Sequence, residues 1–428
     1  MKKLLFLLFC FTPLYLFAQH TVSGKFVPSE KFKWGLLYQI TPTSDRYTAD
    51  TKIDGEGNFS ILLDSTVTPG TYRFVYATPP EEFNFEFIYS GKEDVELTFS
   101  ETEGLSFSAS EENKVWNSYQ LEMAQLNEEI ERQYQSSEVD VTSIELLIKV
   151  QRELQNGFEM ASKNKIAGSL IRASKPYLPI VHQEWEAYQK QQKIHYFDAI
   201  DVNDTVLQES RFLFDRCTNY IRTTEDIDAV ASFLSGASKE FQKSLLANIW
   251  QALVANDLSE FAVYLSKNHL RPLAEELGQL QTATELLTYE RLAIDAIAPD
   301  FSWESEDQST QRFHELTGVD YYILVFWSSG CPHCLKELPK LHTTMESLPK
   351  EKYQVVAFGL EDDLYNWRNE SLRLPSFLHI PGLGKWENEV AKTYAINRTP
   401  TYFLLDKDKR IMGKPADLSE LEALITGE

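Results

Sequence analysis

The chain has 428 residues, of which 43% are hydrophobic, 13% aromatic and 25% charged, and its formal net charge is −23. This composition excludes a wholly disordered chain, and the length indicates two to three domains. The acidic balance argues against nucleic acid and anionic membrane surfaces as partners.

Residues 1–19 have the pattern of a secretory signal peptide. Lys2 and Lys3 precede an almost wholly apolar run, Leu4 to Phe17, and Ala18 offers a small residue for cleavage. The alternative is a membrane anchor, but the run is shorter than the roughly 18–20 residues that a spanning helix needs. We therefore expect an exported, soluble chain in the periplasm or cell envelope of a Gram-negative bacterium.

Residues 20–109 are expected to form an antiparallel domain that resembles a β-sandwich. Short alternating runs recur along this stretch, with turn signals such as Asp54-Gly55 and Pro69-Gly70 between them. The expected strands include Gly35–Ile40, Phe59–Leu63, Thr71–Tyr76 and Asp94–Phe99.

Residues 110–297 are expected to form a helical domain without a catalytic motif. Glycine becomes scarce, and apolar residues such as Val115, Tyr119 and Met123 fall at helical spacing. The prolines at 176 and 179 predict a break between helices.

Residues 298–428 have an α/β pattern, beginning at Ala298-Pro299. The expected strands are Tyr321–Trp327, Tyr353–Gly359 and Thr401–Leu405. The expected helices are Cys331–Ser347, Glu361–Leu372, Trp386–Tyr394 and Leu418–Thr426.

Three cysteines follow the expected leader, and two of them, Cys331 and Cys334, form a C-x-x-C. Export to an oxidising compartment would allow a disulfide. Cys217 is left over and shares a helical face with Leu213 and Ile221. We interpret it as a small buried apolar residue, with a resolving thiol as the alternative.

The motif Cys331-Pro332-His333-Cys334 follows an apolar strand and opens a helix. Thiol–disulfide exchange needs a thiolate, which the unpaired amides and the dipole of a helix N-terminus stabilise. We expect Cys331 to be the exposed nucleophile with a lowered pKa, and Cys334 to resolve the mixed disulfide from one turn deeper. Pro332 suits the first helical turn, where its missing N–H has no partner.

Further along the chain, Thr399-Pro400-Thr401 precedes an apolar strand. With Phe326-Trp327, the C-P-H-C motif, Glu337 and Pro339, this turn resembles the thioredoxin superfamily, and within it the TlpA/ResA-like extracytoplasmic oxidoreductases. The resemblance covers the C-terminal third, 298–428, and implies a thioredoxin fold.

The resemblance also implies roles for individual residues. Pro400 is expected to be cis and to face the cysteine pair, while Thr399 helps to hold an extended substrate peptide. We expect Trp327 and Pro332 to belong to the same substrate-binding surface. Glu337 matches a glutamate that this subfamily places near its active site, with a solvated helix residue as the alternative.

Two positions depart from thioredoxin itself, which carries a buried aspartate where this chain has Val325 and a tryptophan where it has Gly330. The Gly330 change leaves that face more open. His333 leaves the redox direction open. The Pro-His pair is that of DsbA-type oxidases, whereas the surrounding family consists mostly of reductases, so we expect a reduction potential between about −120 and about −270 mV.

A lone C-x-x-C also occurs as half of a zinc site, but no second C-x-x-C accompanies it. We therefore expect no metal and no cofactor beyond a redox-active Cys331–Cys334 disulfide. The intact cysteines and Thr-Pro turn argue against an inactive domain.

The sequence predicts an oxidoreductase that exchanges disulfides with envelope proteins and is served by a membrane redox partner. The alternative is an envelope interaction or assembly protein, whose β and helical domains bind a partner and whose thioredoxin domain is an accessory or redox-regulated module.

Overall fold

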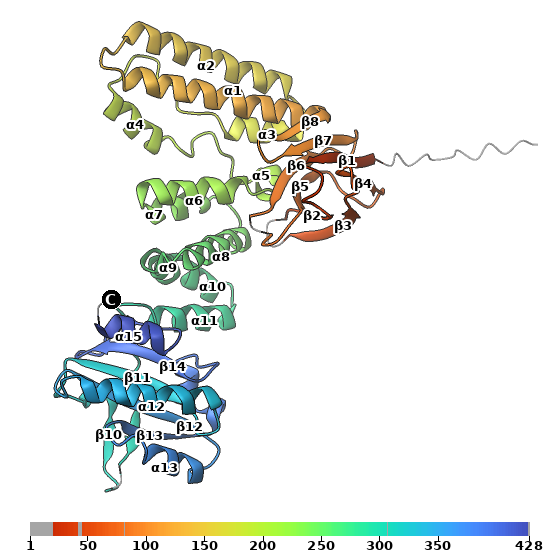
Figure 1. The fold of residues 1–428 in the computed structure, drawn as a ribbon. Coiled ribbons are helices and arrows are strands. Elements are labelled where there is room, and N and C mark those ends of the chain that lie inside the picture. The colour runs from red at the N-terminus through yellow and green to blue at the C-terminus, as the bar shows by residue number, and fades with distance from the viewer. Residues whose placement is uncertain (1–19, 42–44, 81, 306, 427–428) are drawn as a thin grey trace, which may run out of the picture. The chain divides into compact units, whose positions relative to one another are not determined.

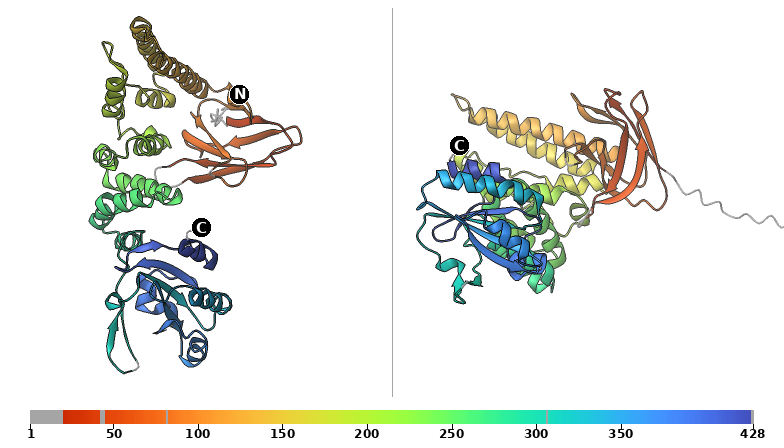
Figure 2. Two further views of the ribbon diagram at one scale, coloured as in Figure 1. Left: turned by 60° about the vertical axis from the view of Figure 1, so that its left-hand side comes forward. Right: turned by 60° about the horizontal axis from the view of Figure 1, so that its bottom comes forward.

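The computed structural model describes residues 20–41, 45–80, 82–305 and 307–426 (Figure 1). The expected leader, residues 1–19, lies outside them. Strands, then helices, then an α/β part follow one another along the chain, which confirms the expected multidomain fold class (Figures 1 and 2). The chain divides into two compact units at Leu245/Leu246, inside α8, so the expected helical region contributes to both units.

The N-terminal unit begins with two four-stranded sheets, ordered β4-β1-β7-β8 and β3-β2-β5-β6. The strands are β1 His20–Val27, β2 Trp34–Gln39, β3 Arg46–Lys52, β4 Asn58–Leu63, β5 Gly70–Val75, β6 Asn84–Tyr89, β7 Val95–Ser100 and β8 Gly104–Ala109. Both sheets contribute side chains to one core, including Val22 and Leu97 from the first sheet and Leu37 and Phe74 from the second.

One pairing departs from the antiparallel arrangement that the sequence predicted. Strands β1 and β7 run parallel, with Val22 opposite Val95. Parallel neighbours need a long crossover connection, which the intervening strands provide.

The helical part follows β8, and its helices are α1 Glu111–Tyr134, α2 Val141–Ala161, α3 Ile166–Ala173, α4 Trp185–Ile194, α5 Thr205–Gln208, α6 Phe212–Thr224, α7 Ile227–Leu234, α8 Lys239–Ala255, α9 Ser259–Leu265, the π-helix η1 Ser266–Leu270, α10 Arg271–Glu276 and α11 Leu280–Arg291. Pro176 and Pro179 lie between α3 and α4, where a break was predicted. The side-chain amide of Asn113 links α1 to β6. It accepts the backbone N–H of Ile88 and donates to the Ile88 carbonyl, each at 2.7 Å.

The α/β part has a five-stranded sheet of order β13-β12-β11-β14-β15. Strands β11, β12 and β13 run parallel, and β14 runs antiparallel to β11. The elements are β9 Ser302–Glu304, β10 Thr310–Arg312, η2 Phe313–Glu315, β11 Tyr321–Trp327, α12 Pro332–Ser347, β12 Tyr353–Glu361, α13 Tyr365–Ser371, β13 Leu378–Leu383, η3 Lys385–Glu387, α14 Glu389–Thr393, β14 Thr401–Asp406, β15 Ile411–Gly413 and α15 Leu418–Thr426.

The incoming chain contacts the β15 end of this sheet before Ala298, the residue at which the sequence pattern changes. The Asp295 N–H donates to the Ile411 carbonyl at 2.8 Å, and Ile297 forms an antiparallel bridge with Arg410.

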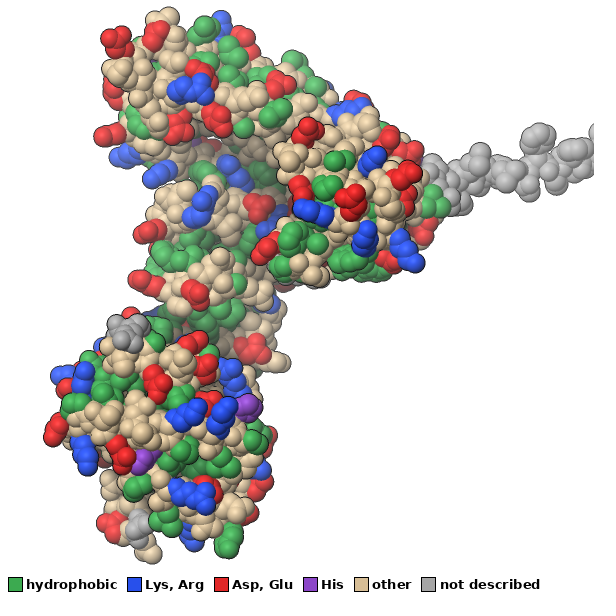
Figure 3. Space-filling view, viewed as in Figure 1, with side chains coloured by type: hydrophobic (Ala, Val, Ile, Leu, Met, Phe, Trp, Pro, Cys, Tyr) green, Lys and Arg blue, Asp and Glu red, His purple; other side chains and the backbone are tan. Residues whose placement is uncertain are grey.

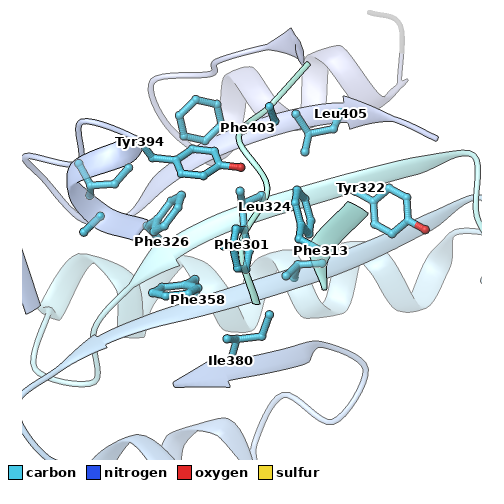
Figure 4. Close-up of a cluster of buried hydrophobic side chains, with 14 of the residues drawn as sticks. Phe301, Phe313, Tyr322, Leu324, Phe326, Phe358, Ile380, Tyr394, Phe403 and Leu405 are labelled. Carbon is cyan, nitrogen blue, oxygen red and sulfur yellow. The ribbon is translucent and has the colours of Figure 1, made fainter. Parts of the chain in front are cut away.

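Strand β11 lies between two apolar cores, which explains its continuous apolar sequence. Tyr322, Leu324 and Phe326 face one core, where Figure 4 shows them beside Phe301 and Phe313. The alternate residues Ile323, Val325 and Trp327 face the other core, which α12 and α15 cover. Packing on both faces fixes the end of β11, from which the C-x-x-C turn starts.

Two helices differ from the sequence prediction. The predicted helix Glu361–Leu372 is wrong at its start, because β12 continues through Glu361 and α13 begins only at Tyr365. The predicted helix Trp386–Tyr394 is interrupted. Trp386 lies in the short η3, and the Asn388 side chain then caps α14 by accepting the Val390 N–H at 2.9 Å.

The surface carries mixed charge, and Figure 3 shows acidic and basic side chains interspersed on the visible face of each unit. Among the described residues, no helix combines the length and apolar character that a membrane crossing requires.

The close packing of α13 on β12 predicts that Gly359→Ala destabilises the α/β part. A Cβ at Gly359 would lie 2.3 Å from Nε1 of Trp367. Overpacking of this kind lowers the free energy of unfolding by about 1–3 kcal/mol, which calorimetry would measure. Gly157→Ala is the matched control, because a Cβ there meets nothing within 4 Å. Equal stability of the two variants would contradict this packing argument.

Candidate active site

The site begins where β11 ends and α12 starts. Residues 328–330 make the connection, and Cys331 is the N-cap of α12, with extended backbone angles of φ −94° and ψ 112°. Its sulfur accepts the backbone N–H of Cys334 at 3.3 Å. The Cys331 N–H in turn donates to the Ser328 carbonyl at 3.1 Å. The predicted nucleophile therefore occupies the position where a helix offers its unpaired amides to a negative charge.

The second part of the site is the turn before β14. The peptide bond between Thr399 and Pro400 is cis. The Cys331 thiol donates to the Thr399 carbonyl at 3.2 Å, so the structure brings together the C-x-x-C motif and the Thr-Pro turn. Pro400 is buried, whereas Thr399 and Cys331 are both partly exposed.

The two thiols are in different electrostatic environments. Burial raises the pKa of Cys331, but side-chain interactions with Cys334 and Thr399, together with the backbone of Cys334 and His333, outweigh this effect and leave the pKa below its ordinary value. Cys334 is fully buried, and burial, with a further contribution from Cys331, raises its pKa to about 12. The thiolate therefore forms more readily at Cys331 than at Cys334.

Glu337 lies in α12 and is partly buried, but its contact is with a tyrosine. The Tyr402 hydroxyl donates to Oε2 of Glu337 at 3.0 Å. Burial, followed by the Glu337 charge, raises the pKa of Tyr402 far above its ordinary value, and Cys334 contributes in the same direction. Tyr402 therefore stays protonated between Glu337 and the buried thiol.

Sequence reasoning missed Glu361. This carboxylate is 5% exposed and lies at the end of β12. Its Oε1 accepts the Ser329 backbone N–H at 2.5 Å, and its Oε2 accepts the Ser329 hydroxyl at 2.9 Å. Glu361 thus holds the turn that carries Cys331. A charged residue that ends an apolar strand was the available signal, and the predicted helix start obscured it.

The remaining predicted site residues differ in their exposure. His333 and Pro332 are exposed at the start of α12, beside the sulfur of the N-cap residue. Trp327 is 1% exposed within the core, so its predicted contact with substrate is corrected. Both faces of β11 are covered by a core, and Trp327 lies in the one beneath α12 and α15.

Cys217 lies in α6 of the other unit and is fully buried. Burial raises its pKa to about 12, which favours the buried apolar interpretation over a resolving thiol. Within the described ranges, no three or more His, Cys, Asp or Glu side chains are grouped so that they could hold a metal ion.

Comparison with known proteins finds a family match within the α/β part and several similar proteins. Residues 294–414 match the model of the AhpC/TSA family. Sporulation thiol-disulfide oxidoreductase A of Bacillus subtilis is 32% identical over 90 residues, which are 21% of this chain and 54% of that protein. Thiol-disulfide oxidoreductase ResA of Geobacillus thermodenitrificans is 23% identical over 120 residues, 28% of this chain and 67% of that protein. The chain therefore spans about half the length of the first relative.

Solved structures also resemble this chain. The thioredoxin domain of a thiol-disulfide oxidoreductase from Bacteroides vulgatus has a TM-score of 0.29 and 21% identity, and covers 32% of this chain and 97% of that one. A thioredoxin-like protein from Bacteroides caccae has a TM-score of 0.37 and 17% identity, and covers 59% of this chain and 97% of that one.

The family match and the sheet with its C-x-x-C helix define the class: the C-terminal third of the chain is a thioredoxin-like domain. Within that class, residues 294–414 match the AhpC/TSA family model, and the chain is similar in part to thiol-disulfide oxidoreductases.

The thiol asymmetry predicts the order of alkylation. Iodoacetamide should modify Cys331 first, and its rate should reach half-maximum at a pH below that of an ordinary cysteine, because only the thiolate reacts. Cys334 and Cys217, both buried with pKa values of about 12, should stay unmodified at neutral pH in the native protein. Peptide mapping by mass spectrometry gives the order, and Cys331→Ser should abolish the fast reaction. Faster modification of Cys334 would contradict the assignment.

The Glu361 contacts predict that Glu361→Ala loosens the Cys331 turn. Losing hydrogen bonds to a charged group costs about 1.5–3 kcal/mol of unfolding free energy. Glu361→Gln should lose less, because its amide can accept the Ser329 N–H and donate to the hydroxyl oxygen. Calorimetry measures the stability, and the alkylation rate of Cys331 reports on the turn. Equal effects of the two substitutions would show that these hydrogen bonds do not hold it.

Proposed function

We propose that this protein is a thiol–disulfide oxidoreductase that exchanges disulfides with protein substrates through Cys331 and Cys334. The observation that carries the proposal is the asymmetry of the pair: a partly exposed sulfur with a lowered pKa precedes a fully buried one in the same helical turn. The names of the curated relatives support this activity.

In the reducing direction, the Cys331 thiolate attacks one sulfur of a substrate disulfide. The substrate S–S bond breaks, the leaving sulfur takes a proton, and a mixed disulfide forms. The Cys334 sulfur, once deprotonated, then attacks Sγ of Cys331 and releases the second substrate thiol. Two electrons and two protons pass to the substrate, and the protein is left with a Cys331–Cys334 disulfide. The reverse sequence oxidises a dithiol.

The lowered pKa of Cys331 bears on direction, because a stabilised thiolate favours the reduced pair and makes the disulfide more oxidising. The apolar leader pattern of residues 1–19 supports export from the cytoplasm. In the periplasm or cell envelope, envelope proteins would be the substrates and a membrane redox protein would restore the working oxidation state.

Substrate trapping tests the function. Cys334→Ala removes the resolving thiol, so mixed disulfides with Cys331 should accumulate and be released by a reductant. The double variant Cys331→Ser/Cys334→Ala is the matched control and should trap nothing. If Cys334→Ala forms no mixed disulfide with a disulfide-bonded protein substrate, the proposed activity is wrong.

A further inference from the structure

A pocket of about 190 Å³ lies directly beside the sulfur of Cys331. Its lining comes from four parts of the α/β unit: the turn after β11, the end of β12, η3 and the turn before β14. The lining residues are Ser328, Gly330, Cys331, Leu360, Lys385, Trp386 and Thr399. Sites for whole small-molecule ligands are usually about 300–1,000 Å³, so this pocket is sized for a single side chain of a larger substrate.

Trp386 gives the pocket its chemical character. Trp386 is a large aromatic residue, yet it is 45% exposed. No residue of η3 is buried, so packing of η3 into the core does not explain why a tryptophan stands here. Leu360 is 1% exposed and belongs to the core, but it adds a small apolar area to the pocket lining. The one charged side chain, Lys385, is already paired with Asp362. The pocket therefore favours an uncharged, apolar guest.

The turn that carries Trp386 is fixed in place. Gly384, with a φ of +92°, donates its N–H to the Glu361 carbonyl at 3.0 Å, and the Glu387 N–H closes onto the Gly384 carbonyl at 2.9 Å. The Asn388 amide donates to the Leu383 carbonyl at 2.9 Å. An aromatic ring on a fixed backbone loses little conformational entropy on binding, as expected of a recognition residue.

Gly330 keeps the pocket open beside the sulfur. Apart from its two chain neighbours, a Cβ at this position would meet only Oγ of Ser328 within 4 Å, at 3.8 Å, so a side chain of a substrate has room there. Gly330 has no side chain, so it leaves space for a substrate beside Cys331. The aromatic surface of the same pocket comes from Trp386 in η3.

We propose that the pocket of Trp386 and Leu360 binds a large apolar or aromatic side chain adjacent to the reacting cysteine of a substrate peptide, and so selects substrates. This inference rests on the proposed function, since it names the substrate class of the same site. Trp386 is the specificity-determining residue.

Two synthetic peptides test the proposal: acetyl-Phe-Cys-Phe-amide and acetyl-Ser-Cys-Ser-amide, each supplied as its symmetrical disulfide. The fully reduced full-length protein reduces each in a single turnover, which yields two peptide thiols and one protein disulfide. Each rate is divided by the rate of the same peptide with dithiothreitol, which removes differences in intrinsic reactivity. We expect a preference of about tenfold for the Phe peptide, the range that one apolar contact in a pocket provides.

Three variants identify the origin of the preference. Trp386→Ala should reduce it to within about twofold, and Trp386→Phe should keep most of it, because an aromatic ring remains. Tyr365→Ala is the matched control: this aromatic residue is 76% exposed in α13 and does not line the pocket, so the preference should be unchanged.

The outcomes separate the inference from the proposed function. If the wild-type protein reduces both peptides at equal normalised rates, or if Trp386→Ala lowers both rates equally, the pocket does not select substrates and the inference is overturned alone. If the wild-type protein reduces neither peptide, the proposed function fails and the inference fails with it.

Discussion

The two hydrogen bonds between the Glu361 carboxylate and Ser329 are the contact on which the geometry of the site depends. They join the end of β12 to the turn that follows β11, and this turn places Cys331 at the N-cap of α12. The backbone carbonyl of the same glutamate accepts the N–H of Gly384, so η3 with Trp386 is fixed from the same point. A mostly apolar strand thus ends in a residue that holds both the proposed nucleophile and the proposed recognition surface.

The difference between the two sulfurs follows from this placement. An N-cap residue faces the free amides of the first turn, so Cys331 has donors directed at its sulfur. Cys334, three residues later, turns into the core beside Leu338 and has lost its contact with water. The position in the helix therefore distinguishes the proposed nucleophile, Cys331, from the proposed resolving thiol, Cys334, and Thr399 adds to the difference in pKa.

Much of this arrangement could be predicted from the sequence because its signals are local. A buried strand followed by a C-x-x-C helix is visible in consecutive residues, and the Thr-Pro turn is a short motif. The predictions were wrong where packing between distant parts of the chain decides the secondary structure. Strand β13 was not expected, since its Pro381 and Gly382 interrupt a strand pattern, yet the sheet edge tolerates them.

The same limit explains the missed residues at the site. Glu361 looked like the first residue of a helix because acidic residues are common there, whereas pairing with β13 extends β12 through it. Trp386 looked like a helix residue because apolar positions recur up to Tyr394. The left-handed backbone at Gly384 instead starts the short η3, and the Asn388 cap separates η3 from α14. Trp327 shows the opposite error, since a motif residue was assigned to substrate contact although cores cover both faces of its strand.

Neither edge of the five-stranded sheet is well suited to pair with an extended substrate chain. A free edge strand pairs readily with any exposed backbone and so promotes aggregation. At one edge the segment around Ile297 already bridges to the β15 end of the sheet, and at the other Pro381 deprives β13 of one backbone donor. Both edges are thereby poor templates for β-augmentation, so an extended substrate of the proposed kind would be held at its sulfur and not as a sixth strand.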